Sequence, residues 1–413
     1  MNARRTRGPL DQTLMRAANM GLILRHLRTH GARSRARLAQ ETGLSRATLS
    51  SVIAELVERG LVREGELKRE GTVGRPGMSV DLDSSRIRAI GVEIAFDYVA
   101  TTTVDLAGEV TDETMLPLAA DELPADDVLD MVARVLRETL TAMHEQDLKP
   151  VAITVSPPGV IDYETGTVRF APNLGWRDVA LVSGLQDRLG PLAPTLHLEN
   201  DARLAALAEH VGFASEGVDD LLYLTGDIGV GAGIIAAGNL VRGWEGFSGE
   251  VGHLPLDPEG RPCKCGRTGC WETGVGLGAL LRLCGDADLA DASRPLEERL
   301  TTIAERAAAG DPTIVDALAR ITTNLANGLS LLNDVLNPRV IVLGGYFAHF
   351  GDQILPSLSE ELERRRMQDG GRVKVVLTRL GMNSAARGGA LMALDGVFND
   401  PTIFPVVAGE SPS

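Results

Sequence analysis

One stretch decides how this chain is organised: Glu250-Val-Gly-His253 and, after a spacer of nine residues, Cys263-Lys-Cys265-Gly-Arg-Thr-Gly-Cys270-Trp-Glu272. Three of the four cysteines in 413 residues lie within eight positions here, and two glycines between the second and third cysteine allow the backbone to fold back. One histidine and three cysteines form a ligand set of tetrahedral zinc. Because His253, Cys263, Cys265 and Cys270 fill all four positions, none is left for a metal-bound water, and we expect a structural Zn2+.

A disulfide is the alternative explanation for these cysteines. A Cys-x-Cys pair is too close for relaxed disulfide geometry. The Arg-rich start of the chain lacks the apolar core of a signal peptide, and no apolar run approaches the roughly 18 residues of a membrane span. We therefore expect a cytoplasmic protein without membrane spans, in a compartment where thiols stay reduced and available to a metal.

The same stretch resembles the signature of the ROK family, which joins bacterial sugar kinases to sugar-responsive repressors. The resemblance covers about residues 86–397. It implies a two-lobed, actin-like ATPase fold in which the zinc loop shapes a sugar pocket, with Glu250, His253 and Glu272 contacting sugar hydroxyls. The spacing by itself indicates only a metal.

Charge divides the chain into a basic head and an acidic body. Residues 1–80 hold 15 Lys and Arg against 7 Asp and Glu, which leaves 26 basic and 49 acidic residues in the remainder. This distribution indicates that only the head binds a polyanion. A solvated basic face without any such partner has the same composition.

The head shows the pattern of a helix-turn-helix. Apolar residues recur at helical spacing over residues 11–29, Ser34 is placed to cap a second helix that Gly43 ends, and Ser45 is placed to cap a third. Residues 61–80 then read as two short strands around a Gly-Arg75-Pro-Gly tip, which is the pattern of a wing. Residues 1–10 are expected to form a disordered arm.

The start of the third helix carries small and polar residues, as a recognition helix in the major groove of DNA does. We expect the contacts to double-stranded operator DNA to come from Ser45, Arg46, Ala47, Thr48, Ser50, Ser51 and, in the wing, Arg75. The alternative is a helical module with a basic surface that binds another protein.

Two strand-turn-strand segments, starting at Ala89 and Leu221, predict two α/β lobes of similar topology around a cleft. In ROK kinases the first turn carries Asp-x-Gly-x-Thr and the second Gly-Thr-Gly, and both hold ATP phosphates. Here the first reads Glu93-x-Ala95-Phe96-Asp97, where Phe96 fills the space that a phosphate needs. Asp227 places a carboxylate in the second turn, and its repulsion of a phosphate costs roughly several kcal/mol. Both departures argue against ATP binding.

Further sugar contacts are implied by the resemblance. It assigns sugar binding to Gly159, Asn173, Asn200 and Asp201, and the aspartate is the catalytic base of the family's kinases. Taken as bare sequence, Gly159 and Asn173 are ordinary turn residues, and Asn200-Asp201 is an ordinary helix N-cap. Without a phosphate donor, a base at Asp201 becomes a ligand contact.

We therefore expect an α/β protein with a winged helix-turn-helix at 1–82, a first lobe at 83–200 completed by a helix at 385–397, a second lobe with the zinc loop at 201–384, and a polar tail at 401–413. The predicted function is a sugar-responsive transcriptional repressor of carbohydrate metabolism without kinase activity, acting as a homodimer or homotetramer because helix-turn-helix proteins read paired half-sites. The alternatives are a sugar kinase with a DNA-binding head, and a regulator whose body only dimerises.

Overall fold

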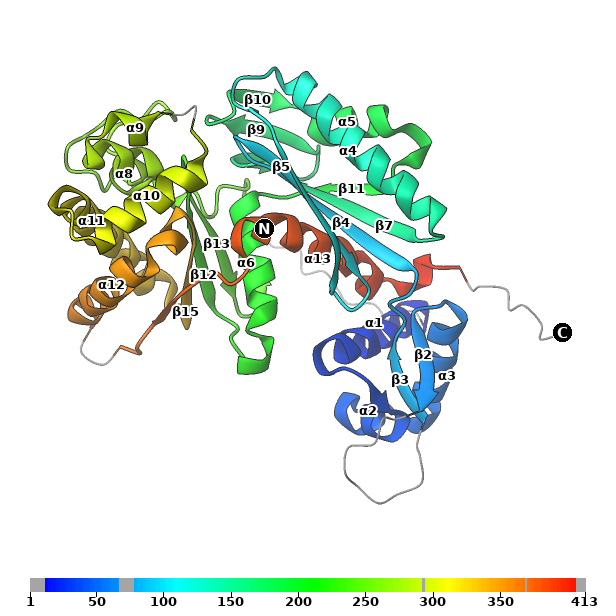
Figure 1. Cartoon of the computed structure of the whole chain (residues 1–413). Helices are drawn as coiled ribbons and strands as arrows, with labels where there is room; N and C mark the ends of the chain where they lie inside the picture. Colours follow the sequence, from blue (N-terminus) through cyan, green and yellow to red (C-terminus); the bar gives the residue numbers. More distant parts are fainter. Residues whose placement is uncertain (1–11, 67–77, 292–293, 368–369, 406–413) are drawn as a thin grey trace, which may run out of the picture.

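The computed structural model describes residues 12–66, 78–291, 294–367 and 370–405, which form a small head and two larger lobes (Figure 1). The predicted arm over residues 1–10 and the wing tip with Arg75 lie outside the described residues, as do the last residues of the predicted tail. None of the described helices is long and apolar enough to cross a membrane.

The head is a winged helix-turn-helix. Its elements are the helices α1 (Gln12–His30), α2 (Arg35–Thr42) and α3 (Arg46–Glu58) and the strands β1 (Arg33–Ser34), β2 (Val62–Glu66) and β3 (Met78–Leu82), in the sheet order β1-β3-β2. The predicted caps are confirmed. Ser34 accepts a hydrogen bond from the Arg37 amide, Gly43 ends α2 at a φ of 73°, and Ser45 accepts from the Thr48 amide.

The first lobe is built on a sheet with the strand order β11-β7-β4-β5-β6. Its elements are β4 (Ile87–Ile94), β5 (Tyr98–Asp105), β6 (Val110–Pro117), β7 (Lys149–Ser156), β11 (Thr195–Leu198), α4 (Ala125–Glu145), α5 (Leu181–Leu189) and the turn η1 (Gly190–Leu192). Residues 160–179, which showed no strand pattern in the sequence, form a second small sheet of β8 (Val160–Asp162), β9 (Thr167–Ala171) and β10 (Trp176–Val179). These strands are too short to show an alternating pattern.

The second lobe repeats this plan with the strand order β14-β13-β12-β15-β16. Its strands are β12 (Leu221–Gly226), β13 (Val230–Ala236), β14 (Asn239–Leu240), β15 (Val340–Gly345) and β16 (Lys374–Leu377). Its helices are α7 (Glu272–Val275), α8 (Leu277–Cys284), α9 (Ala287–Ala290), α10 (Leu296–Ala308), α11 (Pro312–Leu336) and α12 (Gly351–Arg365), and its short turns are η2 (Ala214–Glu216), η3 (Val251–His253), η4 (Tyr346–Phe350) and η5 (Gly381–Asn383).

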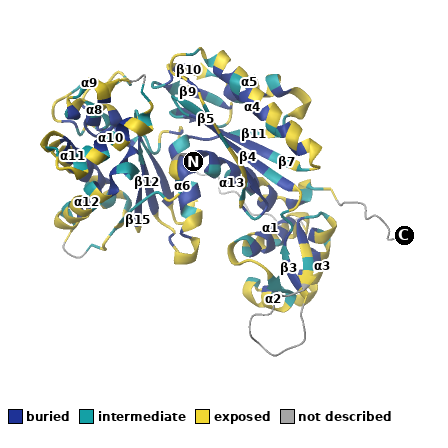
Figure 2. Ribbon diagram, in the orientation of Figure 1, coloured by how far each residue is buried: buried dark blue, intermediate teal, exposed yellow. Residues whose placement is uncertain are grey.

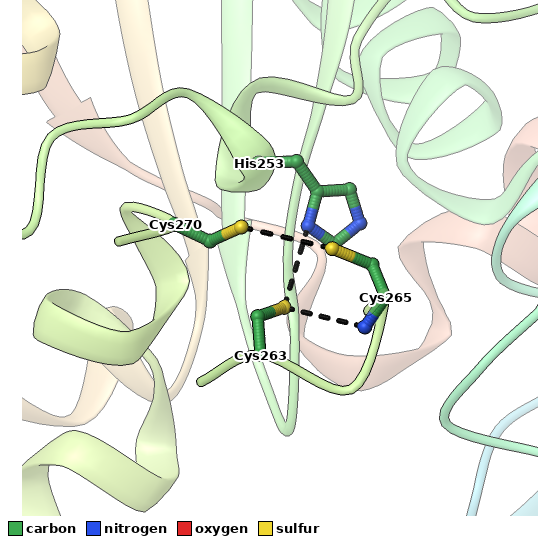
Figure 3. A group of neighbouring side chains, drawn as sticks. All are labelled: His253, Cys263, Cys265 and Cys270. Carbon is green, nitrogen blue, oxygen red and sulfur yellow. Dashed lines mark hydrogen bonds between the residues drawn. The ribbon is translucent and has the colours of Figure 1, made fainter. Parts of the chain in front are cut away.

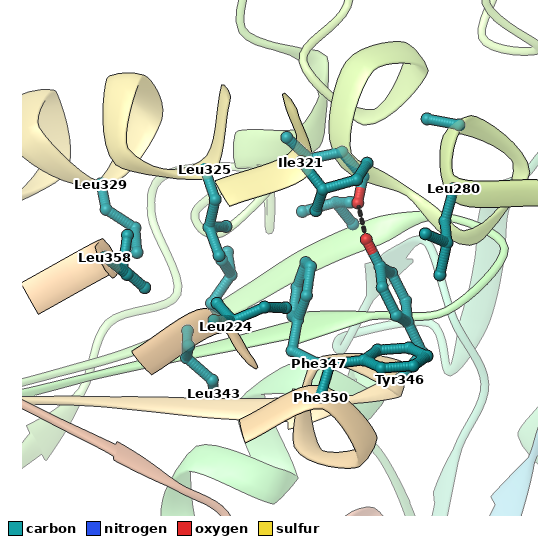
Figure 4. Packing of buried hydrophobic residues seen from close by; sticks show 14 of the residues in the cluster. Leu224, Leu280, Ile321, Leu325, Leu329, Leu343, Tyr346, Phe347, Phe350 and Leu358 are labelled. Atoms are coloured by element: carbon teal, nitrogen blue, oxygen red, sulfur yellow. Dashed lines mark hydrogen bonds between the residues drawn. The ribbon is translucent and has the colours of Figure 1, made fainter. Parts of the chain in front are cut away.

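The two sheets share one arrangement. In each, the first strand pairs antiparallel with the next strand and parallel with a later one: β4 with β5 and β7, β12 with β13 and β15. Each lobe also has its own apolar core, and Figure 4 shows that of the second lobe, where Leu224 and Leu343 of the sheet meet Leu325 of α11 and Phe347 of η4. The predicted two-lobed α/β architecture is confirmed.

Two helices at the centre connect the lobes and the head. They are α6 (Asp201–Gly212) and α13 (Ser384–Asn399), which pack against each other, with α13 also against β4 and α6 against β13 (Figure 1). A Cβ atom on Gly91 would lie 1.7 Å from the Ala386 carbonyl oxygen, and one on Gly388 would lie 1.9 Å from that of Leu204. Only glycine allows these backbones to approach so closely.

The head packs directly on the end of α13. Met20 and Leu24 of α1 share one apolar cluster with Leu394 and Phe398, and the Arg28 guanidinium lies 4.5 Å from the centre of the Phe398 ring. The tail differs from the expectation at its start. The turn η6 (Pro401–Ile403) and Phe404 lie against the head. Pro401 is buried there, and Arg59 of the head donates to the carbonyl oxygens of Thr402 and Phe404.

Candidate functional site

The predicted metal ligands come together at the edge of the second lobe (Figure 3). His253 ends the turn η3, and Cys270 lies just before α7. Between them, the bridge Pro262 to Thr268 closes a tight hairpin that carries Cys263 and Cys265. Local backbone geometry therefore brings the four side chains to one point.

The distances fit a metal better than a disulfide. The four ligand atoms all lie within 4.8 Å of one another, and the Cys265 and Cys270 sulfurs are 3.7 Å apart. A disulfide requires about 2.05 Å. Two sulfurs on a tetrahedral zinc, each at about 2.3 Å from the metal, are about 3.8 Å apart. The site is thus able to hold a metal ion of tetrahedral preference.

The metal loop is tied to the core of the second lobe through Trp271. This side chain is 1% exposed, and its indole Nε1 donates to the Asn324 carbonyl oxygen on α11 at 2.9 Å. Gly328 leaves room for the ring, since a Cβ atom there would lie 2.2 Å from it. The ligand Cys270 is therefore adjacent in sequence to a rigid anchor.

A cavity of about 920 Å³ lies between the lobes and reaches the metal loop. All seven residues to which the resemblance assigned sugar contacts line it: Gly159, Asn173, Asn200, Asp201, Glu250, His253 and Glu272. They come from the loops after β7 and β9, the start of α6, the turn η3 and the start of α7. Their role in binding a ligand stays a prediction, whereas their position in the lining of one cavity is a property of the fold.

Asn200 and Asp201 differ in how they are used. Asn200 is the N-cap of α6, accepting from the Arg203 amide at 3.2 Å, and its amide group donates to the Gly159 carbonyl oxygen at 3.1 Å. The capping alternative therefore holds for this residue, which also fixes the Gly159 loop. Asp201 lies beside it with one oxygen on the Ala202 amide, and burial raises the pKa of its carboxyl group.

A buried charge network behind the cavity was missed in the sequence. Arg203 of α6 is 1% exposed and lies 3.1 Å from the Glu199 carboxylate, which also accepts from Arg242 at 2.6 Å. Arg203 also donates to the Ser248 carbonyl oxygen and to the Tyr163 hydroxyl. Because Tyr163 lies between β8 and β9, the network joins the two lobes. The spacing of Glu199 and Arg203 by four residues was the available signal.

The cavity is also lined by the residues at which the sequence departs from the two phosphate-binding turns that the resemblance led us to expect. Phe96, Asp97 and Asp227 line it, together with Glu93 of β4. Burial raises the pKa of Glu93 to about 8, with the nearby Asp201 and Asp227 acting in the same direction. Burial and the charge of Asp201 raise the pKa of Asp227 to about 6. This part of the cavity is therefore rich in carboxyl groups.

The predicted DNA contacts lie on the outer face of the head. Ser45, Arg46, Ala47, Ser50 and Ser51 are exposed and Thr48 is half-buried, while Leu49, Val52 and Ile53 of the same helix face the core (Figure 2). The Ser45 and Thr48 hydroxyls lie 2.9 Å apart at the cap, and Ser51 accepts a bond from Arg16. The free part of this face is therefore centred on Arg46, Ala47 and Ser50.

A winged-helix head joined to a two-lobed, actin-like body with a central cavity and a histidine-cysteine centre defines a class of DNA-binding regulator. Comparison with known families agrees: the profile of the ROK family matches residues 89–396, and that of the MarR family matches residues 21–75. The chain belongs to the ROK family, and its head places it with the family's transcriptional regulators.

Similar proteins match over different extents. The xylose repressor of Bacillus subtilis is 28% identical over 391 residues, covering 93% of this chain and 97% of the relative. A crystal structure of a ROK family transcriptional regulator, a homolog of the E. coli MLC protein, has a TM-score of 0.78 at 25% identity and covers 96% of this chain and all of that one. A ROK family glucokinase from Streptomyces griseus in complex with glucose and AMPPNP has a TM-score of 0.64 at 26% identity and covers 75% of this chain and all of that one. The two regulators therefore match the head and body together, whereas the glucokinase covers a share of the chain that corresponds to the body.

Proposed function

We propose that this protein is a repressor that binds operator DNA through α3 and the wing and is controlled by a sugar in the cavity between the lobes. The observation that carries the proposal is that Asp201, Glu250 and Glu272 line the same cavity. Carboxylates accept hydrogen bonds from the vicinal hydroxyl groups of a sugar. The xylose repressor supports a sugar as the class of ligand.

The metal is proposed to be a structural Zn2+ held by His253 and the three cysteines. Four protein ligands saturate a tetrahedral ion, so its contribution is to folding of the loop rather than to chemistry. His253 Nε2 lies 3.8 Å from a Glu250 oxygen, and Cys263 Sγ lies 2.7 Å from a Glu272 oxygen. The two glutamates proposed to face the sugar therefore lie directly beside the metal ligands, so a change in the metal loop also displaces them.

Kinase activity is the competing function, and we propose that it is absent. The resemblance gives Asp201 the place of the kinases' base and Phe96, Asp97 and Asp227 the place of their phosphate turns, and all four line the same cavity. Carboxylates and a phenyl ring in place of glycine-rich turns support the loss of phosphate binding. The test is phosphate transfer from ATP with Mg2+ to xylose, glucose or N-acetylglucosamine, with a ROK glucokinase as positive control. Sugar phosphate formed by the unmodified protein establishes the kinase alternative.

Coupling between sugar and DNA is proposed to pass through α13. This helix contacts α6 of the second lobe, β4 of the first lobe and α1 of the head. Closure of the lobes on a sugar changes the angle between α6 and β4, and the head moves with the end of α13 to which it is packed. In a homodimer or homotetramer, such a movement changes the spacing of paired heads and hence operator affinity.

The deciding experiment measures operator affinity of the full chain across a panel of sugars. We expect one sugar to change the affinity at least about fivefold, the lower range of allosteric coupling. Asp201→Ala should remove the response and leave sugar-free DNA binding intact. Glu138→Gln, an exposed change on α4, is the matched control and should keep the response. A body that only dimerises gives no response to any sugar.

A further inference from the structure

The cavity extends well beyond the sugar contacts. Even if each of the twelve heavy atoms of a hexose took up the roughly 30 Å³ of a liquid water molecule, the sugar would fill no more than about 360 Å³. The cavity measures about 920 Å³. Most of its volume is therefore left when one ring binds at Asp201, Glu250 and Glu272.

Charged side chains lead from the sugar contacts into this remaining volume, which we call the distal half. Asp201 is close enough to act electrostatically on both Glu250 and Asp227, Asp227 is within reach of Asp97, and Asp97 is within reach of Arg299. We define the distal half by lining residues other than the predicted sugar contacts: Glu93, Asp97, Asp227 and Arg299 are among its charged groups, and Tyr98 and Leu296 supply less polar wall.

Polar atoms in the distal half lack hydrogen-bond partners among the described residues. These atoms are Asp97 Oδ1, Glu93 Oε2 and Arg299 Nε, and all three are buried. The Glu93 and Arg299 side chains as a whole are 8% and 7% exposed. Leaving a buried donor or acceptor unpaired costs about 1–3 kcal/mol, so these atoms mark positions where a ligand or water completes the bonding. A carboxyl acceptor near a guanidinium donor matches a hydroxyl group, which both donates and accepts.

The charge of the lining selects against anions. Seven carboxyl groups and two arginines line the cavity: Glu93, Asp97, Asp201, Asp227, Glu250, Glu272 and Glu297 against Arg294 and Arg299. Burial raises the pKa of Glu93 to about 8 and that of Glu250 to about 7, and the other five carboxyl groups still outnumber the two arginines. A sugar phosphate brings up to two further negative charges into this surrounding. A neutral polyol avoids that repulsion and still satisfies the unpaired atoms.

We propose, building on the proposed sugar-responsive function, that the effector is a neutral disaccharide or related glycoside rather than a single sugar or a sugar phosphate. Its first ring binds at Asp201, Glu250 and Glu272. Its second ring lies in the distal half, where a hydroxyl group donates to Asp97 and accepts from Arg299, and the ring face contacts Tyr98 and Leu296.

The test is isothermal titration of the metal-loaded full chain with matched pairs: xylose and xylobiose, glucose and cellobiose or maltose, N-acetylglucosamine and its β-1,4 dimer, with glucose 6-phosphate and ATP as anionic probes. In at least one pair the disaccharide should bind about tenfold or more tightly than its monosaccharide, the effect of one or two added hydrogen bonds to charged groups. Both anionic probes should bind more weakly than any sugar that binds.

Two variants locate the second ring. Asp97→Asn keeps the size of the side chain, and Leu296→Trp fills the distal half from the start of α10, where Leu296 is half-buried. Both should reduce the affinity for the disaccharide to that for its monosaccharide and leave monosaccharide binding unchanged. The Asp97→Asn variant should also melt at nearly the same temperature as the unmodified protein. A weaker affinity for the disaccharide then reflects lost contacts rather than lost folding.

Three outcomes overturn the inference, and they are distinguishable from failure of the proposed function. Monosaccharides that bind as tightly as their disaccharides remove the second ring and leave a sugar-responsive repressor. ATP or glucose 6-phosphate binding in competition with the sugar assigns the distal half to an anion. If no sugar binds and none changes operator affinity, the proposed function fails together with the inference.

Discussion

The cavity and the outer face of the head are the two regions that bind a partner in our proposal, and they are built in opposite ways. The DNA contacts on α3 fall within residues 45–51 and are mostly exposed, so water and salt surround them. The residues that line the cavity are drawn from positions 93–385, and its buried carboxyl groups Asp201 and Asp227 have raised pKa values. One region thus depends on the sequence of one helix, and the other depends on the whole fold of the body.

The largest effect expected from this difference follows removal of a metal ligand. Cys265→Ser should lose the zinc and the sugar response, because binding of a structural zinc contributes on the order of 10 kcal/mol to ordering of its loop. Metal analysis of the native protein should find one zinc per chain, and calorimetry should show the variant melting at lower temperature. Cys284→Ser changes a buried thiol outside the metal site and should keep the metal. A variant at Cys265 that still holds one zinc per chain contradicts the assigned ligands.

A smaller effect is expected at the cavity wall. Asp201→Ala should weaken sugar binding by roughly tenfold to a hundredfold, the loss of one or two hydrogen bonds to a charged group at about 1.5–3 kcal/mol each. Titration calorimetry measures it, and operator affinity without sugar should stay unchanged. If Asp201→Ala alters sugar-free DNA binding as much as sugar binding, the cavity and the DNA-binding face are not separate binding sites.

At the head, Arg46→Ala should weaken operator binding by about 1–3 kcal/mol if the side chain reads a base, and should then affect random DNA much less. Equal loss on both kinds of DNA assigns Arg46 to phosphate. Arg137→Ala on α4 removes the same charge from an exposed position outside the head and is the control. Gel-shift titrations at several salt concentrations measure these affinities, which should fall steeply with salt. Binding that survives both Arg46→Ala and Arg75→Ala places the DNA interface elsewhere.

The last effect concerns the pH dependence of stability, which builds up gradually with each pH unit. The pKa of Glu93 is raised by burial from 4.5 to about 8, so the folded state holds its proton more tightly than the unfolded state. The stabilising effect of that proton is complete below about pH 4.5 and is lost as pH rises to about 8, at about 1.4 kcal/mol per pH unit. Glu93→Gln should remove this slope, so the variant gains stability relative to the unmodified protein between pH 5 and 8. Thermal unfolding of both proteins across this pH range measures the difference in stability. If the stability of the two proteins changes with pH by the same amount, Glu93 does not hold a proton in the folded state.

The difference between the head, which depends on local sequence, and the cavity, which depends on the whole fold, also explains which parts of the structure could be predicted from the sequence. In the head, the caps Ser34, Gly43 and Ser45 act within a few residues of their positions in the chain, so local signals located the helices. The metal ligands were also local, since one hairpin carries two of them. Local chemistry is visible in a single sequence because the interacting groups are neighbours in it.

The cavity was predictable only in part. Motif resemblance placed seven residues on its wall, but the side chains that complete it were not found. Arg299 lines the cavity from α10, and Tyr163 and Arg242 belong to the charge network behind it; they come from separate elements and meet only through packing of the lobes. The small sheet of β8, β9 and β10 was missed for a related reason, because its strands are held by pairing with one another rather than by an apolar pattern of their own.

Trp271, the buried side chain next to the metal ligand Cys270, allows the state of the metal site to be followed by intrinsic fluorescence. The chain has three tryptophans: Trp176 and Trp271 are 3% and 1% exposed, whereas Trp244 is 97% exposed. An indole in apolar surroundings fluoresces at shorter wavelength than one in water. Chelation of the metal should loosen Trp271, next to Cys270, from its place on α11 and move its emission to the red, while the contribution of Trp244 stays constant. Loading of the metal site is thus measurable in solution without any label.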